Sequence, residues 1–145
     1  MRYCTLDDLA LAIPLATLIA LSNDDAHADA VNQDVIERAV TQAEELIDAS
    51  LRGRYQLPMA EVPTPVTEMT VTLARHWLYA RRPEGGELPD AVVRTYSATL
   101  KMLDQIRTGA LTLGLPSGEK AKAPARYKRK SSRRRFGDDV LDTQP

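Results

Sequence analysis

The chain is poor in the residues that hold small folds together by covalent or metal bonds. Its 145 residues include one cysteine, Cys4, and two histidines, His27 and His76. A single cysteine cannot form a disulfide within the chain, so we do not expect a secreted disulfide scaffold. The N-terminal segment carries acids where a signal peptide would be apolar, and no apolar run reaches the roughly 18 residues of a membrane span. We therefore expect a protein made in the cytoplasm, without a membrane segment.

Aromatic residues are also scarce, at 5% of the chain, whereas hydrophobic residues make up 43%. A chain of this length and composition suits one domain with a modest core, built mostly from Leu, Ile, Val and Ala.

The net charge of −1 conceals an uneven distribution. Residues 1–115 hold ten Lys and Arg against sixteen Asp and Glu, a net of −6, whereas residues 116–145 hold nine against four, a net of +5. We therefore predict an acidic helical domain over 1–115 and an extended basic tail over 116–145. The basic residues of the tail are Lys120, Lys122, Arg126, Lys128, Arg129, Lys130, Arg133, Arg134 and Arg135, with Tyr127 and Phe136 among them as stacking or anchoring groups.

Hydrophobic residues recur at three- and four-residue spacing, which predicts an all-α fold. Two short helices are expected over about 6–12 and 15–21, and three longer ones over about 33–54, 65–82 and 89–108. The predicted apolar stripe of the first long helix is Val35, Ile36, Ala39, Val40, Ala43, Leu46, Ile47, Ser50 and Leu51, and that of the last is Val92, Tyr96, Leu100, Leu103 and Ile106.

Helix ends are marked by capping residues. Thr5 and Asp8 form a capping-box pattern, Thr64 precedes Pro65 as a cap of the second long helix, and Gly109 suits the end of the last. The alternation of leucine with other residues over 110–115 then predicts a short strand, which would need a partner such as another copy of the chain.

Groups able to catalyse a reaction or bind a metal are sparse. His27 lies in a predicted loop with Asp24, Asp25 and Asp29, where a solvated loop is a better interpretation than a metal site, and His76 is expected to serve packing or the surface. The neighbouring acids are interpreted as solvated helix faces, because adjacent helical residues diverge by about 100°. These pairs are Asp7-Asp8, Asp24-Asp25 and Glu44-Glu45. No nucleophile or phosphate-binding motif is complete, so we expect neither an enzyme nor a cofactor.

Several stretches, in order, resemble the Mu-like phage neck protein family. They are MRYCTLDDL at 1–9, AEELIDASLRGRYQLP at 43–58, Val62-Pro63, Ala74-Arg75 with Leu78-Tyr79, and Gly109-x-Leu-x-Leu-Gly114. The resemblance covers about residues 1–115, and the basic tail lies outside it.

The resemblance implies a head–tail connector, also called an adaptor or head-completion protein, located in the virion neck and made in the host cytoplasm. Such subunits form a homo-oligomeric ring, commonly dodecameric, that binds the portal protein, extends the DNA channel, and meets a tail terminator or stopper protein. In similar adaptors the C-terminal segment becomes ordered when it docks on the portal.

Two sets of residues are candidates for these contacts. One set, for oligomer or portal contact, is Arg52, Arg54, Tyr55, Leu111, Leu113 and Leu115; its alternative is capping and local packing. The other set is the basic tail, which could neutralise DNA phosphates, dock on an acidic surface such as that of the portal, or merely keep the protein soluble. An alternative function is that of a nucleic-acid-binding accessory protein that uses this tail as an arm.

Overall fold

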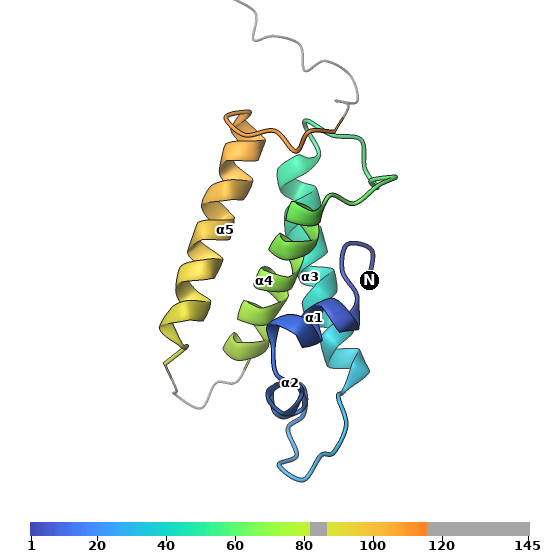
Figure 1. Ribbon diagram of the computed structural model, residues 1–145, viewed down its shortest axis with the longest axis vertical. Coiled ribbons are helices and arrows are strands. Elements are labelled where there is room, and N and C mark those ends of the chain that lie inside the picture. Colours follow the sequence, from blue (N-terminus) through green and yellow to red (C-terminus); the bar gives the residue numbers. More distant parts are fainter. Residues whose placement is uncertain (82–86, 116–145) are drawn as a thin grey trace, which may run out of the picture.

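The structure is a computed structural model that describes residues 1–81 and 87–115. The predictions for the basic tail therefore lie outside the described residues. Within the described part the chain is helical: α1 is Leu6–Ala12, α2 is Leu15–Ser22, α3 is Gln33–Leu51, α4 is Thr64–Ala80 and α5 is Asp90–Thr108 (Figure 1). The predicted all-α class, with two short and three longer helices, is confirmed. None of these helices is long and apolar enough to cross a bilayer.

The three long helices form an up-down-up bundle. Helix α4 runs antiparallel to α3 and α5 and packs against both (Figure 1). Helices α1 and α2 contact α4 at the end where α3 begins, and α2 also contacts α3. The segment after α5 crosses the opposite end of the bundle, from α5 toward the end of α3.

Capping sets several helix ends. Thr5 and Asp8 form the reciprocal capping box, and Asn32 caps α3 by accepting from the Val35 N–H. Gly109 ends α5 with φ +86°, a left-handed conformation that glycine adopts without a Cβ penalty. The expectation for Thr64 is wrong by one residue, because the helix starts at Thr64 and Pro63 occupies the cap position.

Helix α3 is shorter than predicted. It ends at Leu51 instead of continuing to Arg54, and the next residues form a tight turn in which the Arg54 and Tyr55 N–H groups donate to the Leu51 carbonyl. A linker that includes a cis peptide bond between Leu57 and Pro58 leads to α4.

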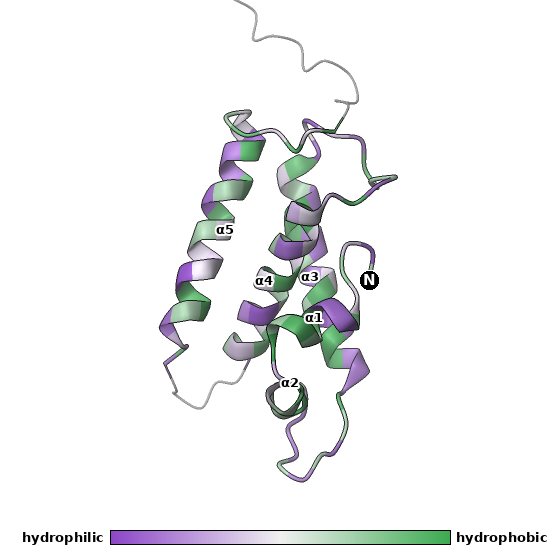
Figure 2. Cartoon of the chain, viewed as in Figure 1, coloured by the Kyte–Doolittle hydropathy of each residue, from purple (hydrophilic) through white to green (hydrophobic). Residues whose placement is uncertain are grey.

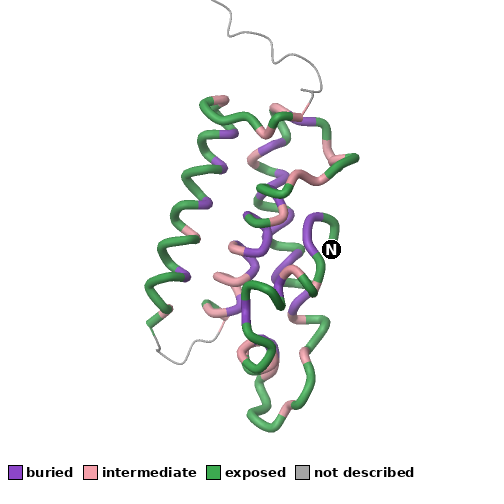
Figure 3. Tube along the Cα trace, viewed as in Figure 1, coloured by how far each residue is buried: buried purple, intermediate pink, exposed green. Residues whose placement is uncertain are grey.

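The core consists mainly of aliphatic residues from all five helices, as the scarcity of aromatics predicts (Figure 3). Two positions of the predicted stripes depart from expectation: Leu46 is 39% exposed and Leu100 is 37% exposed. On α5 the neighbouring Thr99 is buried instead of Leu100, because the face toward the bundle follows positions 92, 99, 103 and 106.

The predicted strand over 110–115 is wrong. No strand occurs in the described part of the chain, and this segment folds back over the bundle. The Leu111 N–H donates to the Gln105 carbonyl, and Gly114 has φ +72°, which breaks an extended ladder. Leu113 and Leu115 pack half-buried against the core of their own chain. The alternating leucines therefore reflect a folded-back loop in place of a pleated strand.

Candidate interaction surfaces

The predicted contact residues after α3 and α5 meet at one corner of the bundle. The buried Tyr55 hydroxyl accepts a hydrogen bond from the Leu113 N–H at 2.9 Å, which joins positions 58 residues apart. The Arg54 guanidinium occupies the space that a Cβ on Gly109 would need. Two of the candidate residues thus contact the segment after α5 within one chain.

The other candidates at this corner are more accessible. Arg52 follows α3 with its N–H donating to the Asp48 carbonyl at 2.9 Å, and its side chain is exposed. Leu111 is 38% exposed, next to an open groove of about 370 Å³ between α4 and α5. The corner therefore offers Arg52 and Leu111 to a partner, whereas Tyr55 and Leu113 hold the fold.

A buried acidic cluster on α3 holds the N-terminal segment. Glu44 is only 3% exposed, and its carboxylate accepts from the backbone N–H groups of Arg2 and Tyr3, the latter at 2.9 Å. Asp48 accepts from the Tyr3 hydroxyl, and its second oxygen pairs with the Arg2 guanidinium at 2.9 Å. We call Arg2, Tyr3, Glu44 and Asp48 the N-terminal clasp.

The clasp shifts the titration of its members. Burial first, and then the hydrogen bond to Asp48, raise the pKa of Tyr3 to about 12, because both oppose a phenolate. The hydrogen bond to Asp48 is also the main cause that raises the pKa of Arg2. Burial raises the pKa of the neighbouring Cys4 thiol to about 11, so that thiol stays protonated at neutral pH.

The prediction that Glu44 belongs to a solvated helix face is wrong. Its neighbour Glu45 is exposed as expected. Glu44, about 100° away round the helix, faces the N-terminal segment instead. Asp8 is neither buried like Glu44 nor a plain solvated acid like Glu45. Its carboxylate completes the cap of α1, and the hydrogen bonds that it accepts from Thr5 lower its pKa. The i, i+4 spacing of Glu44 and Asp48 was the one local signal, since it places both acids on one face.

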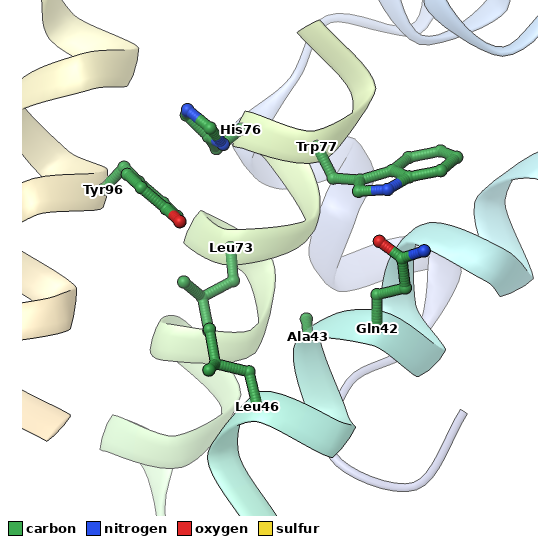
Figure 4. A pocket seen from close by; sticks show the side chains of 7 residues that line it. All are labelled: Gln42, Ala43, Leu46, Leu73, His76, Trp77 and Tyr96. Atoms are coloured by element: carbon green, nitrogen blue, oxygen red, sulfur yellow. The ribbon is translucent and has the colours of Figure 1, made fainter. Parts of the chain in front are cut away.

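His76 lines a small cavity between α3, α4 and α5 (Figure 4). Its ring stacks on Tyr96 with centroids 3.7 Å apart and planes inclined by 11°. Burial lowers the pKa of His76, because a charged ring would lose hydration there. The packing role predicted for His76 agrees with this geometry.

His27 is exposed, and its backbone N–H donates to the Asp25 carboxylate in a local turn. Asp24 instead pairs with Arg81 at 2.9 Å. Among residues 1–81 and 87–115, no group of three or more His, Cys, Asp or Glu side chains is placed to hold a metal ion.

Two apolar surfaces face solvent. At the turn between α1 and α2, Leu11 is 89% exposed and Leu15 is 60% exposed. On α5, Val93 and Leu100 are 43% and 37% exposed. Figure 2 shows hydrophobic residues on both elements, and Figure 3 shows that both carry much exposed surface.

Fold and surfaces together define a small helical-bundle protein with apolar faces open to solvent. The family model described as "Bacteriophage Mu, Gp36" matches residues 3–131. The chain belongs to this family of Mu-like phage proteins, which confirms the resemblance. The match extends past residue 115 into the basic tail, further than the resemblance predicted.

Two relatives illustrate the similarity. The chain is 30% identical to "Mu-like prophage FluMu protein gp36" of Haemophilus influenzae over 88 residues, which are 61% of this chain and 59% of that protein. It is 27% identical to "Gene product J" of Escherichia phage Mu over 117 residues, 81% of this chain and 79% of that protein. The match to the Haemophilus protein thus spans about three fifths of that relative's length.

Proposed function

We propose that this phage protein is a structural component of the virion, a head–tail connector subunit. In this proposal copies of the chain form a ring under the portal, extend the DNA channel, and present a surface to a tail terminator or stopper protein. The observation that carries the proposal is membership of the Mu Gp36 family, joined to the neck location implied by the resemblance over residues 1–115.

The surfaces of the bundle support an assembly role. Exposed apolar side chains that lie near one another can mark contacts with other macromolecules, and Leu11 and Leu15 lie four residues apart at the turn between α1 and α2. Among the described residues, the exposed side chains of Arg52 and Leu111 are also accessible to a neighbouring subunit. A ring repeats every such contact once per subunit, so individually weak contacts add to a strong attachment.

The basic tail would attach the ring to its neighbours. Nine Lys and Arg lie within the sixteen positions from Lys120 to Arg135. In the connector hypothesis these charges dock on an acidic surface of the portal, and any contact with channel DNA is non-specific.

The same nine charges favour a second candidate function, a nucleic-acid-binding accessory protein with a basic arm. The two functions differ in salt dependence and location. An arm that neutralises phosphates gives DNA affinity that falls steeply with salt, whereas a connector has no need to bind free DNA.

The experiment is cryo-electron imaging of particles that carry either the natural chain or a full-length variant with all nine tail Lys and Arg changed to Gln. We expect symmetric copies between portal and tail for the natural chain, and failure of attachment for the variant. A matched control changes the tail acids Asp138, Asp139 and Asp142 to Asn and should leave attachment intact. The connector function would be wrong if the natural chain is absent from mature particles. Salt-sensitive DNA binding by the purified protein would then support the accessory function in its place.

A further inference from the structure

We propose that the groove between α4 and α5 is a docking site for the chain's own basic tail, with the side chain of Tyr127 seated in it. The contact holds residues 126–130 against the body of the same subunit until a partner displaces them. It goes beyond the connector function and does not depend on it. We call the site the α4–α5 groove. Its apolar walls are formed by Pro65, Met69, Met102, Leu111 and Leu113.

The α4–α5 groove has room for an aromatic side chain. Its volume is about 370 Å³, whereas an apolar cavity of roughly 150 Å³ already holds benzene. Met69 is buried and Met102 is 39% exposed, so one methionine lies deep in the groove and the other is accessible. Methionine side chains are flexible, and their sulfur atoms make favourable contacts with aromatic rings. The groove therefore offers an aromatic ring both space and suitable walls.

Two threonine hydroxyls in the groove lack a partner. Thr72 on α4 and Thr99 on α5 line the groove, and neither hydroxyl makes a hydrogen bond within the described part of the chain. Thr99 is only 8% exposed. Among the described residues, Arg75 Nε is the only fully enclosed side-chain nitrogen or oxygen without a partner, so the Thr99 hydroxyl opens onto the groove. A ring that carries a hydroxyl can pair with it, as the phenol of tyrosine does.

The charge at the groove favours a basic ligand. Glu68 is the one charged residue among those that line it, and it is exposed without an ion-pair partner in the described part of the chain. Lys101 is next to Met102 in sequence, but its side chain points about 100° away round α5. At longer range, the net charge of −6 over residues 1–115 also attracts a basic segment.

Tyr127 is the tail residue that meets both requirements. It lies within residues 126–130, a run with four Lys and Arg and no acid. Phe136 has no hydroxyl to offer the threonines. The apolar pair at 140–141 stands between two aspartates, which Glu68 would repel.

The tail begins at the wall of the groove, which selects this chain's own tail as the occupant. Leu113 lines the groove and donates its N–H to the Tyr55 hydroxyl, and Leu115 packs on the core two residues later. Eleven residues separate Leu115 from Tyr127, and they reach at most roughly 36–40 Å, enough to return to the groove. A short flexible tether gives an effective concentration on the order of millimolar. In a micromolar solution, Tyr127 of the same chain therefore outcompetes Tyr127 of a second copy.

The test follows the methionine methyl groups of the full-length chain by NMR. The chain has four methionines, of which Met69 and Met102 line the groove. An aromatic ring shifts the signal of a methyl group that it faces, so Tyr127→Ala should move both signals while the signal of Met1 stays in place. The matched control is Phe136→Ala, which removes an aromatic ring from the same tail and should leave all four signals as in the natural chain.

Trypsin cleavage gives a second readout in which the tail sequence is unchanged. Glu68→Lys removes the acid at the groove, so cleavage within residues 126–130 should become several-fold faster, with cleavage at 133–135 as the internal reference. Glu45→Lys makes the same change of charge at an exposed site on α3 and should be cleaved at the natural rate. Circular dichroism checks that each variant stays helical.

Three results would each overturn the inference. The first is that the Met69 and Met102 signals are the same in the natural chain and in Tyr127→Ala. The second is that these signals move when the natural chain is diluted, which would assign the groove to the tail of another copy. The third is that Glu68→Lys is cleaved within 126–130 no faster than the natural chain. None of these results bears on the connector function, which the imaging experiment tests separately.

Discussion

The N-terminal clasp permits a quantitative test of the buried acid on α3. Glu44→Ala removes the acceptor of the Arg2 and Tyr3 backbone N–H groups and one partner of the Arg2 guanidinium, at 3.3 Å. Hydrogen bonds to charged groups contribute about 1.5–3 kcal/mol each, but the released N–H groups lie near the chain terminus and can bind water. The Arg2 side chain is 45% exposed, so its ion pair adds little after solvent screening.

We therefore expect Glu44→Ala to lower the free energy of unfolding by about 2–3 kcal/mol. The measurement is urea denaturation followed by circular dichroism and by the fluorescence of the single tryptophan, Trp77. The midpoint should fall while the slope with denaturant stays unchanged, because the variant and the natural chain expose nearly the same amount of surface on unfolding.

The matched control is Glu45→Ala, which removes the same carboxylate one position along the same helix, where the side chain is exposed. A surface change of this kind should alter stability by no more than about 0.5 kcal/mol. Equal midpoints for Glu44→Ala and Glu45→Ala would refute the reasoning, because they would mean that the clasp adds no net stability.

Three further predictions concern other contacts. Tyr55→Phe removes only the hydroxyl that accepts the Leu113 N–H, so it should cost about 1 kcal/mol and speed hydrogen exchange at that amide while the helices stay protected; unchanged exchange at Leu113 would contradict the contact. Gly109→Ala should cost about 1–2 kcal/mol because the position has φ +86°, whereas Gly53→Ala, in open space without positive φ, should be near neutral; equal melting temperatures of the two variants would speak against this. Because the pKa of Tyr3 is raised from 10.0 to about 12, its stabilising contribution is complete below pH 10 and is lost as the pH rises toward 12. Between pH 9 and 11.5 the natural chain should therefore lose more stability than Tyr3→Phe does. Equal losses in the two proteins would show that the pKa of Tyr3 is not raised by folding.

Much of the fold is encoded in local patterns of the chain. The five helices could be located because their apolar periodicity and caps act within a few residues, as at Thr5 and Gly109. The end of α3 was predicted three residues too late, because Arg52 and Arg54 have the charge that suits a helix C-terminus. The turn that replaces this last part of the helix is held by contacts of Arg54 and Tyr55 with the segment after α5.

The errors share one physical cause. Glu44 looks like half of a solvated acid pair until the N-terminal segment, 42 residues away in sequence, supplies donors for its carboxylate. The leucines of 110–115 alternate like a strand, yet the Tyr55 hydroxyl and the bundle core hold them as a loop. Both environments come from residues that are distant in sequence, so no local window contains them.

The sequence by itself determined that this protein is a member of a Mu-like phage family, helical over the residues that the structure describes, with acidic residues in excess over 1–115 and basic residues in excess over 116–145. Periodicity, caps and charge are properties of neighbouring residues and can be counted directly. Only the tertiary structure decided which acids are buried, which leucines face solvent, and that Leu46, His76 and Tyr96 from three helices line one cavity. Burial is a property of the packed chain, because each side chain is covered by residues from other helices.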